Sequence, residues 1–362
     1  MNILHLYKDY YPVLGGIENH IKVLAEAQTA AGHQVAVLVC DPGSRTRVGT
    51  LNEVKVIKAG RLATAASMPL SLSQPIALAR LQPDVAHIHS PYPLGEVANW
   101  LLGRARATVI THHSDVVRQQ AWLRLYGPIL RCVLRAADRI IATSPRYVET
   151  SPWLRPVQDK CVLVPMGVDP ARFTPPTNQR TNQPTLLFTG RLRYYKGLTT
   201  LLQALPALPG VQLVVVGDGP MREEWERLAD TPGLRDRVTF AGEVPDEDLP
   251  GCYHAADIFV LPANARAEAF GIVLLEAMAS GLPCITTEVG TGTSWVVQDG
   301  VTGLVVPPRD PQALAGAIQS LLADPTQRAA MGQAARARAE IEFTLERMIA
   351  RVQAVYEKAL AA

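Results

Sequence analysis

Two glutamates, Glu268 and Glu276, stand eight positions apart in a largely apolar stretch. The stretch follows an expected strand at 257–261, and its pattern predicts a helix that begins near Phe270. A helix start presents free N–H groups, so the amides of Gly271–Val273 could bind a phosphate. Glu276 would lie about two turns further on, where a hydroxyl-rich ligand could supply the partners that a buried carboxylate needs. The alternative is that Glu268 caps the helix and Glu276 is a salt-bridged core residue.

A basic loop at 189–197 lies between an expected strand and a helix that begins near Leu198. Its glycines let the backbone approach a ligand closely, and Arg191 with Lys196 could neutralise a diphosphate leaving group. The loop is not a Walker A motif, because six positions separate Gly190 from Lys196. The alternative interpretation is a solvated basic loop.

A glycine pair, Gly15-Gly16, separates the first expected strand from a helix expected at 17–30. Open parallel sheets bind ligands at this edge, so the glycine turn could contact a phosphate. The Gly-x-Gly-x-x-Gly spacing is absent, which disfavours a dinucleotide. Glu18 and His20 would point into the same crevice as candidate acceptor-binding residues, unless they simply form a helix N-terminus.

Two adjacent histidines, His112 and His113, stand at the carboxyl end of another expected strand, within Thr111–Asp115. Successive side chains of a strand point to opposite faces, so at most one of the two faces the crevice. We expect no zinc site, because neither an HExxH motif nor a cysteine partner accompanies them. The alternative is a histidine with a purely structural role.

An acidic triplet, Asp246-Glu247-Asp248, has a pattern that could hold a divalent cation. It follows an expected strand at 238–242 and opens a helix towards Tyr253. Acidic residues at a helix start favour the helix dipole. We therefore expect the triplet to cap this helix, and we expect no metal site.

Short β-branched runs position all these groups, and they alternate with helical patterns as in βαβ units of parallel sheets. The expected strands are 2–7, 34–40, 53–59, 85–90, 108–113, 139–144, 161–165, 185–190, 211–217, 238–242, 257–261, 283–287 and 303–306. A Pro-rich segment at 165–184 suits a linker between two such sets. The sequence from about 311 to 362 is helical, with a break at Phe343 and Thr344.

The length of 362 residues exceeds that of one hydrophobic core. We therefore expect an α/β protein of two Rossmann-like, doubly wound parallel-sheet domains. Their predicted bounds are 1–170 and 171–344. A last helix at about 345–362 is expected to pack back on the first domain.

Charge and composition restrict the partners. Residues 1–175 carry 19 Lys and Arg against 12 Asp and Glu, whereas residues 176–362 carry 16 against 21. A basic half without aromatic residues interleaved in Lys/Arg runs does not indicate nucleic acid, but it suits an anionic membrane or a phosphorylated acceptor. Five scattered cysteines without a CxxC pair indicate buried thiols of a cytoplasmic protein. The sequence shows neither a signal peptide nor an apolar run that could span a membrane.

Taken in order, the motifs resemble those of the retaining glycosyltransferases of family 4, which have the GT-B fold. They are Gly15–Glu18, Thr111–His113, Val164–Asp169 with Arg172-Phe173, Gly190-Arg191 with Lys196-Gly197, Gly217–Pro220, and Glu268 to Glu276 with Ser280–Pro283. The resemblance spans nearly the whole chain. It implies two Rossmann-like domains that face a cleft, the first binding the acceptor and the second binding a sugar nucleotide.

The resemblance also implies roles for residues of the second domain. Arg191 and Lys196 match the residues that hold the donor diphosphate. Glu268 matches the carboxylate near the 3- and 4-hydroxyls of the donor sugar, and Glu276 matches the one that binds the ribose hydroxyls. The donor-binding segment beside Glu268 comprises Phe270, Gly271, Ile272 and Val273.

In the first domain, His113 matches a histidine near the donor 6-hydroxyl and the reacting centre, and Gly16 matches an amide that contacts phosphate. The family is usually metal-independent, so no metal and no cofactor beyond the sugar-nucleotide co-substrate are implied. The implied mechanism is a same-face displacement, in which the departing phosphate oxygen helps to take the acceptor proton. Arg191 and Lys196 would stabilise the developing charge.

The segments 287–296 and 300–303 resemble bacterial mannosyl- and rhamnosyltransferases that assemble surface polysaccharides on a lipid-linked diphosphate. We therefore expect transfer of a hexose, mannose from GDP-mannose, to a glycan or polyprenyl-diphosphate-linked acceptor. The alternatives are a transferase of the same fold that uses a UDP-sugar, and a GT-B sugar-nucleotide epimerase, which would need no acceptor.

A helical segment at 116–140 combines basic and apolar residues, as helices at membrane interfaces do. Its arginines are Arg118, Arg124, Arg131, Arg135 and Arg139. We predict a cytoplasmic protein that makes peripheral contact with the inner face of an anionic membrane. The alternative is an ordinary helix that packs its apolar residues on the sheet.

Overall fold

The computed structural model describes residues 1–13, 15–65, 68–116, 120–174 and 183–361. The chain divides into two compact units. Unit 1 comprises Met1–Val164 with Ile349–Ala362, and unit 2 comprises Pro165–Met348. The predicted domain bounds lay at 170 and 344, within six residues of this division.

Unit 1 is built on a sheet with the strand order β10-β9-β8-β7-β1-β2-β4-β3. The strands are β1 (Asn2–Leu6), β2 (Gln34–Cys40), β3 (Arg47–Leu51), β4 (Val54–Ala59), β7 (Val85–Ser90), β8 (Ala107–His112), β9 (Arg139–Ala142) and β10 (Cys161–Leu163). Neighbouring strands run parallel, except that β3 pairs antiparallel with β4. A separate ribbon joins β5 (Ala63–Ala65) and β6 (Met68–Leu70).

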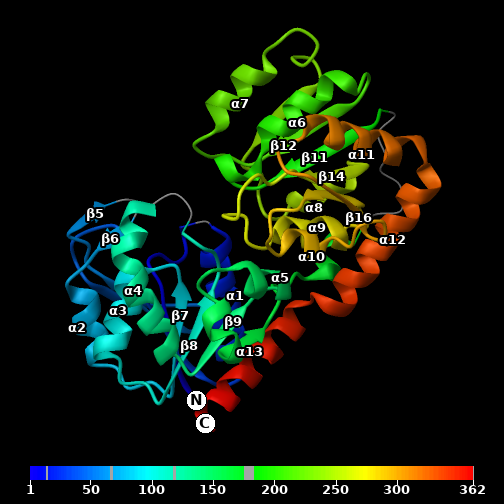
Figure 1. Ribbon diagram of the computed structural model, residues 1–362. Coiled ribbons are helices and arrows are strands. Elements are labelled where there is room, and N and C mark those ends of the chain that lie inside the picture. Colours follow the sequence, from blue (N-terminus) through cyan, green and yellow to red (C-terminus); the bar gives the residue numbers. More distant parts are fainter. Residues whose placement is uncertain (14, 66–67, 117–119, 175–182, 362) are drawn as a thin grey trace. The chain divides into compact units, whose positions relative to one another are not determined.

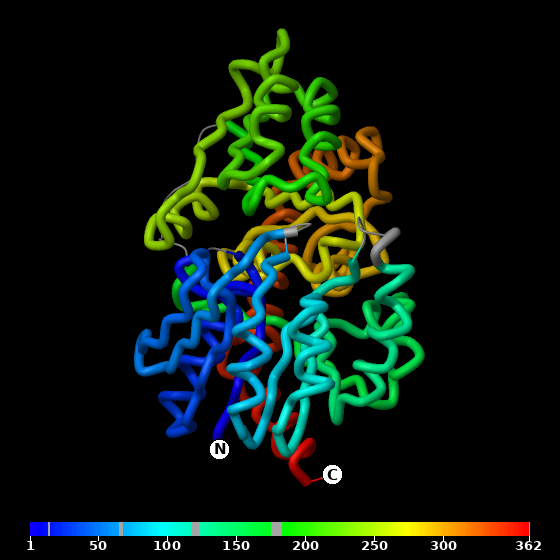
Figure 2. Tube along the Cα trace, turned by 90° about the vertical axis from the view of Figure 1, so that its left-hand side faces the viewer, coloured from blue at the N-terminus to red at the C-terminus, as the bar shows by residue number. Residues whose placement is uncertain are grey.

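Helices connect the strands of unit 1, and α3 and α4 lie together beside β7 and β8 (Figure 1). They are α1 (Gly16–Ala30), α2 (Ser73–Ala79), α3 (Pro93–Leu102), α4 (Gln120–Ala136), α5 (Pro145–Thr150), the 3₁₀ helix η1 (Arg155–Lys160) and the C-terminal α13 (Leu345–Leu360). Both chain termini lie at the same end of this unit (Figure 2).

Unit 2 repeats the arrangement with the strand order β13-β12-β11-β14-β15-β16, all parallel. The strands are β11 (Thr185–Thr189), β12 (Gln212–Val216), β13 (Val238–Gly242), β14 (Ile258–Leu261), β15 (Cys284–Thr287) and β16 (Gly303–Val306). The helices are η2 (Pro170–Phe173), η3 (Tyr194–Lys196), α6 (Leu198–Ala204), η4 (Leu205–Ala207), α7 (Arg222–Ala229), α8 (Leu249–His254), α9 (Ile272–Ala279), α10 (Thr293–Val296), α11 (Pro311–Ala323) and α12 (Pro325–Glu342).

Each sheet has a central point, the reversal point, from which the chain order runs outward in opposite directions. In unit 1 it lies between β1 and β7, and in unit 2 between β11 and β14. Ligands of open parallel sheets bind outside the carboxyl ends of the strands at such a point. The prediction of two Rossmann-like, doubly wound sheets is therefore confirmed, and the strands expected from the sequence are all present.

Some expectations about the elements were wrong. Strand β3 was not predicted, because its residues are almost all exposed and lack an alternating apolar pattern. The helix expected at 116–140 is shorter: α4 ends at Ala136, and Arg139 already belongs to β9. Its first residues, including Arg118, lie outside the described residues.

The cysteines were all expected to be buried. Cys40 and Cys284 are, but Cys132 is exposed on α4. Among the described residues, no helix has both the length and the apolar character needed to cross a bilayer.

Candidate functional site

The central feature of unit 2 is a buried ion pair between Lys196 and Glu268. Lys196 follows β11 and Glu268 follows β14, the two strands that flank the reversal point. Lys196 Nζ donates to Glu268 Oε2 over 3.0 Å, and their side chains are only 9% and 10% exposed. Burial alone would lower the pKa of Lys196, but the charge and hydrogen bond of Glu268, together with Tyr195 and Glu276, outweigh burial and hold this pKa above its usual value. The lysine is therefore charged at neutral pH.

Gly190 leaves the space that Lys196 occupies. It has φ +119°, and a Cβ built on it would lie 3.0 Å from Lys196 Cε and 3.6 Å from Val273 Cγ1. The ammonium group therefore lies beside both Gly190 and the first turn of α9. This close approach is a physical reason for glycine in the basic loop.

The N-terminus of α9 offers free backbone donors next to the lysine. Gly271 is the N-cap residue, with φ +80°, and no side chain caps the helix. Within the described part of the chain, the amides of Gly271, Ile272 and Val273 have no hydrogen-bond partner. Free amides and a buried ammonium together are groups that can bind an anion. The helix was expected to begin near Phe270 and begins two residues later.

Glu276 lies on the half-buried side of α9, together with Ile272 and Val273. Its Oε2 accepts a hydrogen bond of 2.6 Å from the Tyr253 hydroxyl. The Tyr253 oxygen in turn lies 2.7 Å from the hydroxyl of Thr189 at the end of β11. Burial raises the pKa of Glu276, although Tyr253 and the positive charges of Arg172 and Lys196 act in the opposite direction. The alternative of a salt-bridged core residue is not what the structure shows, since the direct partner of Glu276 is a neutral hydroxyl.

The loop that carries Glu268 is fixed to the loop after β15. Thr291 Oγ1 donates to the carbonyl of Glu268 over 2.7 Å, and Gly292 N donates to the carbonyl of Ala269 over 2.8 Å. Arg266 Nη1 donates to the carbonyl of Gly290 over 2.6 Å. These bonds hold the Glu268 side chain against Lys196, so the carboxylate is held in position before any ligand binds.

Two other predicted donor-binding residues differ in exposure. Arg191 has an exposed side chain at the start of the loop after β11. The ring of Phe270 is buried against the rings of Trp295 and Phe343, with centroids 6.5 and 6.3 Å away. Its side chain is part of the core, so only its backbone is left for a ligand.

The acidic triplet at 246–248 does not cap α8 as expected. Asp248 is the N-cap residue but makes no side-chain capping hydrogen bond. Asp246 instead forms an ion pair of 3.8 Å with Arg172, which also donates to the Asp246 carbonyl. The capping prediction was wrong. It took no account of Arg172, which binds Asp246 from a distant part of the sequence.

In unit 1, the two adjacent histidines have separate partners, as strand geometry predicted. His112 Nε2 lies 3.0 Å from Asp115 Oδ1. His113 Nε2 lies 3.0 Å from Nδ1 of His89, which belongs to β7. His113 Nδ1 is buried and has no partner among the residues described. Burial lowers the pKa of His113 well below its usual value, so the ring is neutral.

The start of α1 carries the other predicted residues of unit 1. Gly16 is its first residue, at the carboxyl end of β1, and its backbone is exposed. The Glu18 carboxylate folds back on Gly15, where a Cβ would collide with it, which agrees with the helix N-terminus alternative. His20 is buried, with its ring 5.3 Å from that of His113. Helix α1 thus brings His20 close to His113, which follows β8.

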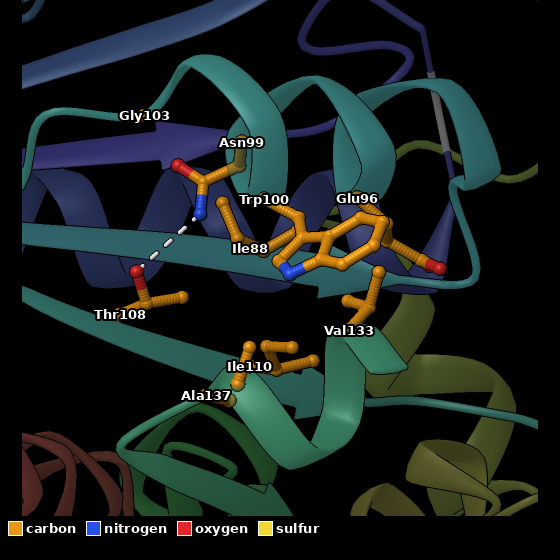
Figure 3. A pocket seen from close by; sticks show the side chains of 10 residues that line it. Ile88, Glu96, Asn99, Trp100, Gly103, Thr108, Ile110, Val133 and Ala137 are labelled. Carbon is orange, nitrogen blue, oxygen red and sulfur yellow. Dashed lines mark hydrogen bonds between the residues drawn. The ribbon is translucent and has the colours of Figure 1, made fainter. Parts of the chain in front are cut away.

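A cavity of about 160 Å³ lies elsewhere in unit 1, between α3 and α4. Figure 3 shows the Trp100 ring and Val133 on its walls, and Asn99 Nδ2 donating to Thr108 Oγ1 over 3.4 Å. None of the predicted site residues lines it. Its position and small size indicate a gap in helix packing.

Several residues of these networks were not found from the sequence. Tyr253 was considered only as part of a helix, because a tyrosine that bonds a distant carboxylate leaves no pattern in the sequence. His87 and His89 did offer a signal, because histidines two apart on a strand face the same side. Their partner His5 lies opposite His87 on β1. That pairing depends on strand order, which the sequence does not state.

Comparison with known proteins relates these features to a family. Residues 14–172 match the family described as Glycosyltransferase Family 4, and residues 171–338 match that described as Glycosyl transferases group 1. The D-rhamnosyltransferase WbpZ of Pseudomonas aeruginosa is 37% identical over 95% of this chain and 92% of its own length. The O-antigen chain mannosyltransferase C of Escherichia coli is 36% identical over 96% of each chain.

A more distant relative and a solved structure extend the comparison. A GDP-mannose-dependent alpha-(1-6)-phosphatidylinositol monomannoside mannosyltransferase of Mycolicibacterium smegmatis is 34% identical over 65% of each chain. The sucrose-phosphate synthase structure from Thermosynechococcus elongatus superposes with a TM-score of 0.84 at 27% identity, covering 99% of each chain. Likeness over nearly the full length agrees with two consecutive Rossmann-like units.

Proposed function

Because this chain belongs to the glycosyltransferases of family 4 with the GT-B fold, we propose that it transfers mannose from GDP-mannose, with retention, to a glycan or polyprenyl-diphosphate-linked acceptor in surface polysaccharide synthesis. The observation that carries the proposal is the buried Lys196–Glu268 pair beside the free amides of α9. The chemistry of a sugar nucleotide fits this arrangement, since it joins a diphosphate to groups rich in hydroxyls.

The diphosphate is assigned to the positive end of the unit 2 site. The amides of Gly271, Ile272 and Val273 donate to its oxygens, and the Lys196 ammonium, which also holds Glu268, donates further charged hydrogen bonds. Arg191 is exposed at the start of the same loop and completes this group. As the bond between sugar and phosphate breaks, the leaving diphosphate gains negative charge that Arg191 and Lys196 stabilise.

The two carboxylates are assigned to hydroxyls of the donor. Glu268 accepts from the sugar hydroxyls, because its loop is fixed by Thr291 and its other contact is Lys196. Glu276 accepts from the ribose, and Tyr253 orients it. They are separate contacts to one donor and do not form a nucleophile and acid pair.

Retention follows from attack on the face that the diphosphate leaves. The acceptor oxygen forms a bond to the anomeric carbon while the carbon–phosphate oxygen bond breaks, and the acceptor proton passes to the leaving oxygen. No side chain needs to act as the base. Because Arg191 and Lys196 supply the positive charge at the diphosphate, we propose that the reaction requires no metal ion.

The choice of donor is supported by the relatives. One has mannosyltransferase in its name at 36% identity, and another is named as GDP-mannose-dependent at 34%. A thermal-shift comparison of GDP-mannose with UDP-glucose tests this proposal. We expect stabilisation by GDP-mannose, and stabilisation by the UDP-sugar alone would contradict it.

Turnover distinguishes the alternatives. Wild-type enzyme incubated with GDP-mannose and an acceptor should give an α-linked product by NMR, unaffected by EDTA. Glu268→Ala should lose this activity, while Glu223→Gln on the exposed face of α7 serves as the matched control. A β-linked product refutes retention, loss in EDTA refutes metal independence, and an epimerised sugar formed from donor alone indicates the epimerase.

We also propose that α3 and α4 place unit 1 on an anionic membrane, where a lipid-linked acceptor resides. Trp100 and Leu101 at the end of α3 are 43% and 64% exposed, and Leu125 on α4 is 73% exposed. Exposed arginines accompany them, including Arg124 and Arg135. Apolar side chains among basic ones suit the interface of an anionic bilayer.

Vesicle sedimentation tests the membrane proposal. Wild-type protein should sediment with vesicles of phosphatidylglycerol and phosphatidylcholine, and less so with phosphatidylcholine alone. Leu125→Ser should weaken this binding, whereas Leu228→Ser, at an exposed leucine of unit 2, should not. Absence of binding to anionic vesicles at low salt refutes the proposal.

A further inference from the structure

A continuous row of hydrogen-bonded side chains runs through the interior of unit 1 and ends at His113. His89 Nδ1 lies 3.0 Å from His113 Nε2, and His5 Nδ1 lies 3.0 Å from His89 Nε2. At the far end, His5 Nε2 lies 2.8 Å from Gln28 Oε1. We call these four residues, Gln28, His5, His89 and His113, the histidine chain.

The sheet explains why these rings meet. β1 and β7 are neighbours with His5 opposite His87, so His89 is displaced from His5 by one pleat on the same face. β8 follows β7 with His89 opposite Thr111, and His113 stands two residues beyond. The three rings therefore come from adjacent strands at successive positions towards their carboxyl ends.

The interior keeps the rings neutral. Burial lowers the pKa of His5 to about 4, and it lowers the pKa values of His89 and His113 well below the usual range. A neutral imidazole has one N–H donor and one acceptor nitrogen. Each ring in the histidine chain can therefore donate in one direction only.

Gln28 sets that direction. Its Nε2 donates to Tyr356 Oη over 3.2 Å, which leaves Oε1 to accept from His5 Nε2. His5 Nδ1 must then accept from His89 Nε2, and His89 Nδ1 must accept from His113 Nε2. The proton of His113 is thus on Nε2, and its Nδ1 is an acceptor.

Tyr356 supports the same direction through a second contact. Its hydroxyl accepts from Gln28 and therefore donates to His87 Nδ1, 2.6 Å away. His87 Nε2 then donates to Thr111 Oγ1, also 2.6 Å away. One assignment of protons thus satisfies the Tyr356 hydroxyl and both nitrogens of His87.

We propose that the histidine chain holds His113 as the Nε2–H tautomer, so that its unpartnered Nδ1 accepts a hydrogen bond from a hydroxyl of the donor sugar. Gln28, His5 and His89 are positioning residues in this proposal. It rests on the proposed function, because the resemblance places His113 beside the donor 6-hydroxyl. The buried Nδ1 without a partner is the observation that points to a ligand.

A metal ion is the competing occupant. His20, His89 and His113 offer ligand atoms within 4.8 Å of one another, and His20 Nε2 also has no partner among the described residues. A metal held by all three would need a nitrogen of His89, and both nitrogens of His89 already bond neighbouring rings, Nδ1 with His113 and Nε2 with His5. The continuous chain therefore favours protons over a metal.

The direct test is NMR of the full chain labelled with ¹⁵N-histidine, without any ligand. Long-range ¹H–¹⁵N correlations should show the proton of His113 on Nε2. Gln28→Leu should leave His113 as a mixture of both tautomers. Gln74→Leu, a buried glutamine of the same unit outside the histidine chain, should not change the tautomer. A proton on Nδ1 in the wild type, or Zn²⁺-induced shifts of the His20, His89 and His113 nitrogens, overturns the proposal.

A second test uses wild-type enzyme and altered donors, so it does not depend on a variant that folds. Fluorine accepts but cannot donate, so the 6-deoxy and 6-deoxy-6-fluoro donors should both lose about 10-fold or more in kcat/KM. Recovery with the fluoro donor alone would show that His113 donates, and would overturn the assignment. If no sugar nucleotide binds at all, the proposed function fails while the NMR result on the tautomer still stands.

Discussion

The two units place different kinds of polar group in their interiors. Unit 1 buries a group of neutral imidazoles that bond one another, Gln28 and Tyr356. Unit 2 buries a full ion pair, Lys196 with Glu268, and a second carboxylate held by Tyr253. His5 and His89 stand on the two strands at the reversal point of unit 1, whereas Lys196 and Glu268 follow the two strands at the reversal point of unit 2.

The difference shows what each group can recognise. Neutral rings in a fixed order present a defined acceptor but no charge, which suits a hydroxyl group. An ammonium beside free amides presents positive charge, which suits a phosphate. The two groups should also respond in opposite ways to acid, because burial disfavours charge on histidines and on carboxylates alike.

The largest expected effect is loss of unit 1 stability in mild acid. Burial lowers the pKa values of His5 and His20 to about 4, so their unfolded forms bind protons first as the pH falls below about 6.5. Stability is therefore complete above about pH 6.5 and is lost towards pH 4. These two residues alone should cost about 4 kcal/mol by pH 5.

The opposite sign holds for Glu276, whose pKa is raised, so protonation in acid relieves its burial. Amide hydrogen exchange by mass spectrometry at pH 7.5 and 5, corrected for intrinsic rates, reports on both units. Peptides of unit 1 should lose protection first. An equal loss of protection in unit 2 at pH 5 would contradict the predicted difference between the two units.

The next effect is that of breaking the ion pair. Lys196→Met leaves Glu268 buried without its cation and should cost about 3 kcal/mol in urea unfolding. The double variant with Glu268→Gln should recover much of this. The exposed pair Arg222–Glu226 is the control, where Arg222→Met should cost under about 1 kcal/mol. If the double variant is as unstable as Lys196→Met, the unpaired charge of Glu268 is not the cause of the instability.

A smaller effect is expected from filling the space beside Lys196. Gly190→Ala puts a methyl group 3.0 Å from Lys196 Cε at φ +119°, and should cost about 2 kcal/mol and weaken donor binding. Gly210→Ala is the matched control, because Gly210 also has positive φ but nothing lies within 4 Å. Thermal unfolding and donor titration measure both. Unchanged donor affinity in Gly190→Ala would indicate that Lys196 does not contact the donor.

The smallest effect is expected from Tyr253→Phe, which removes the hydroxyl that bonds Glu276. Loss of one hydrogen bond should cost about 1 kcal/mol and raise the pKa of Glu276 further. Donor KM should rise, and more at pH 6 than at pH 8, because the protonated carboxyl accepts less well. Tyr10→Phe removes a buried hydroxyl without a partner among the described residues and should leave KM unchanged. A pH-independent change in KM would contradict the assignment of Glu276.

Much of the fold was accessible from the sequence. Buried parallel strands are short apolar runs, and their polar ends are marked by glycine, so the strands and the loops at 189–197 and 266–271 were located. The exposed β3 was not, because an edge strand in water needs no apolar pattern. The end of α4 was misjudged, since Arg139 fits both a basic helix and the strand β9.

The candidate site was accessible in part. The positions of Lys196 and Glu268 were predicted, but not their bond, because 72 residues separate them. The role of Asp246 was mistaken for the same reason, as Arg172 lies 74 residues away. Contacts of this kind depend on which strands are neighbours, and local patterns carry no information about that.

By itself, then, the sequence determined where chemistry-bearing residues follow strands, because periodicity and glycine placement are local properties of the chain. The tertiary structure alone decided which of them meet. The order of β1, β7 and β8 aligned His5, His89 and His113, and burial made their protons directional. The order of β11 and β14 brought Lys196 to Glu268 and made a charged site from residues that the sequence shows only as separate motifs.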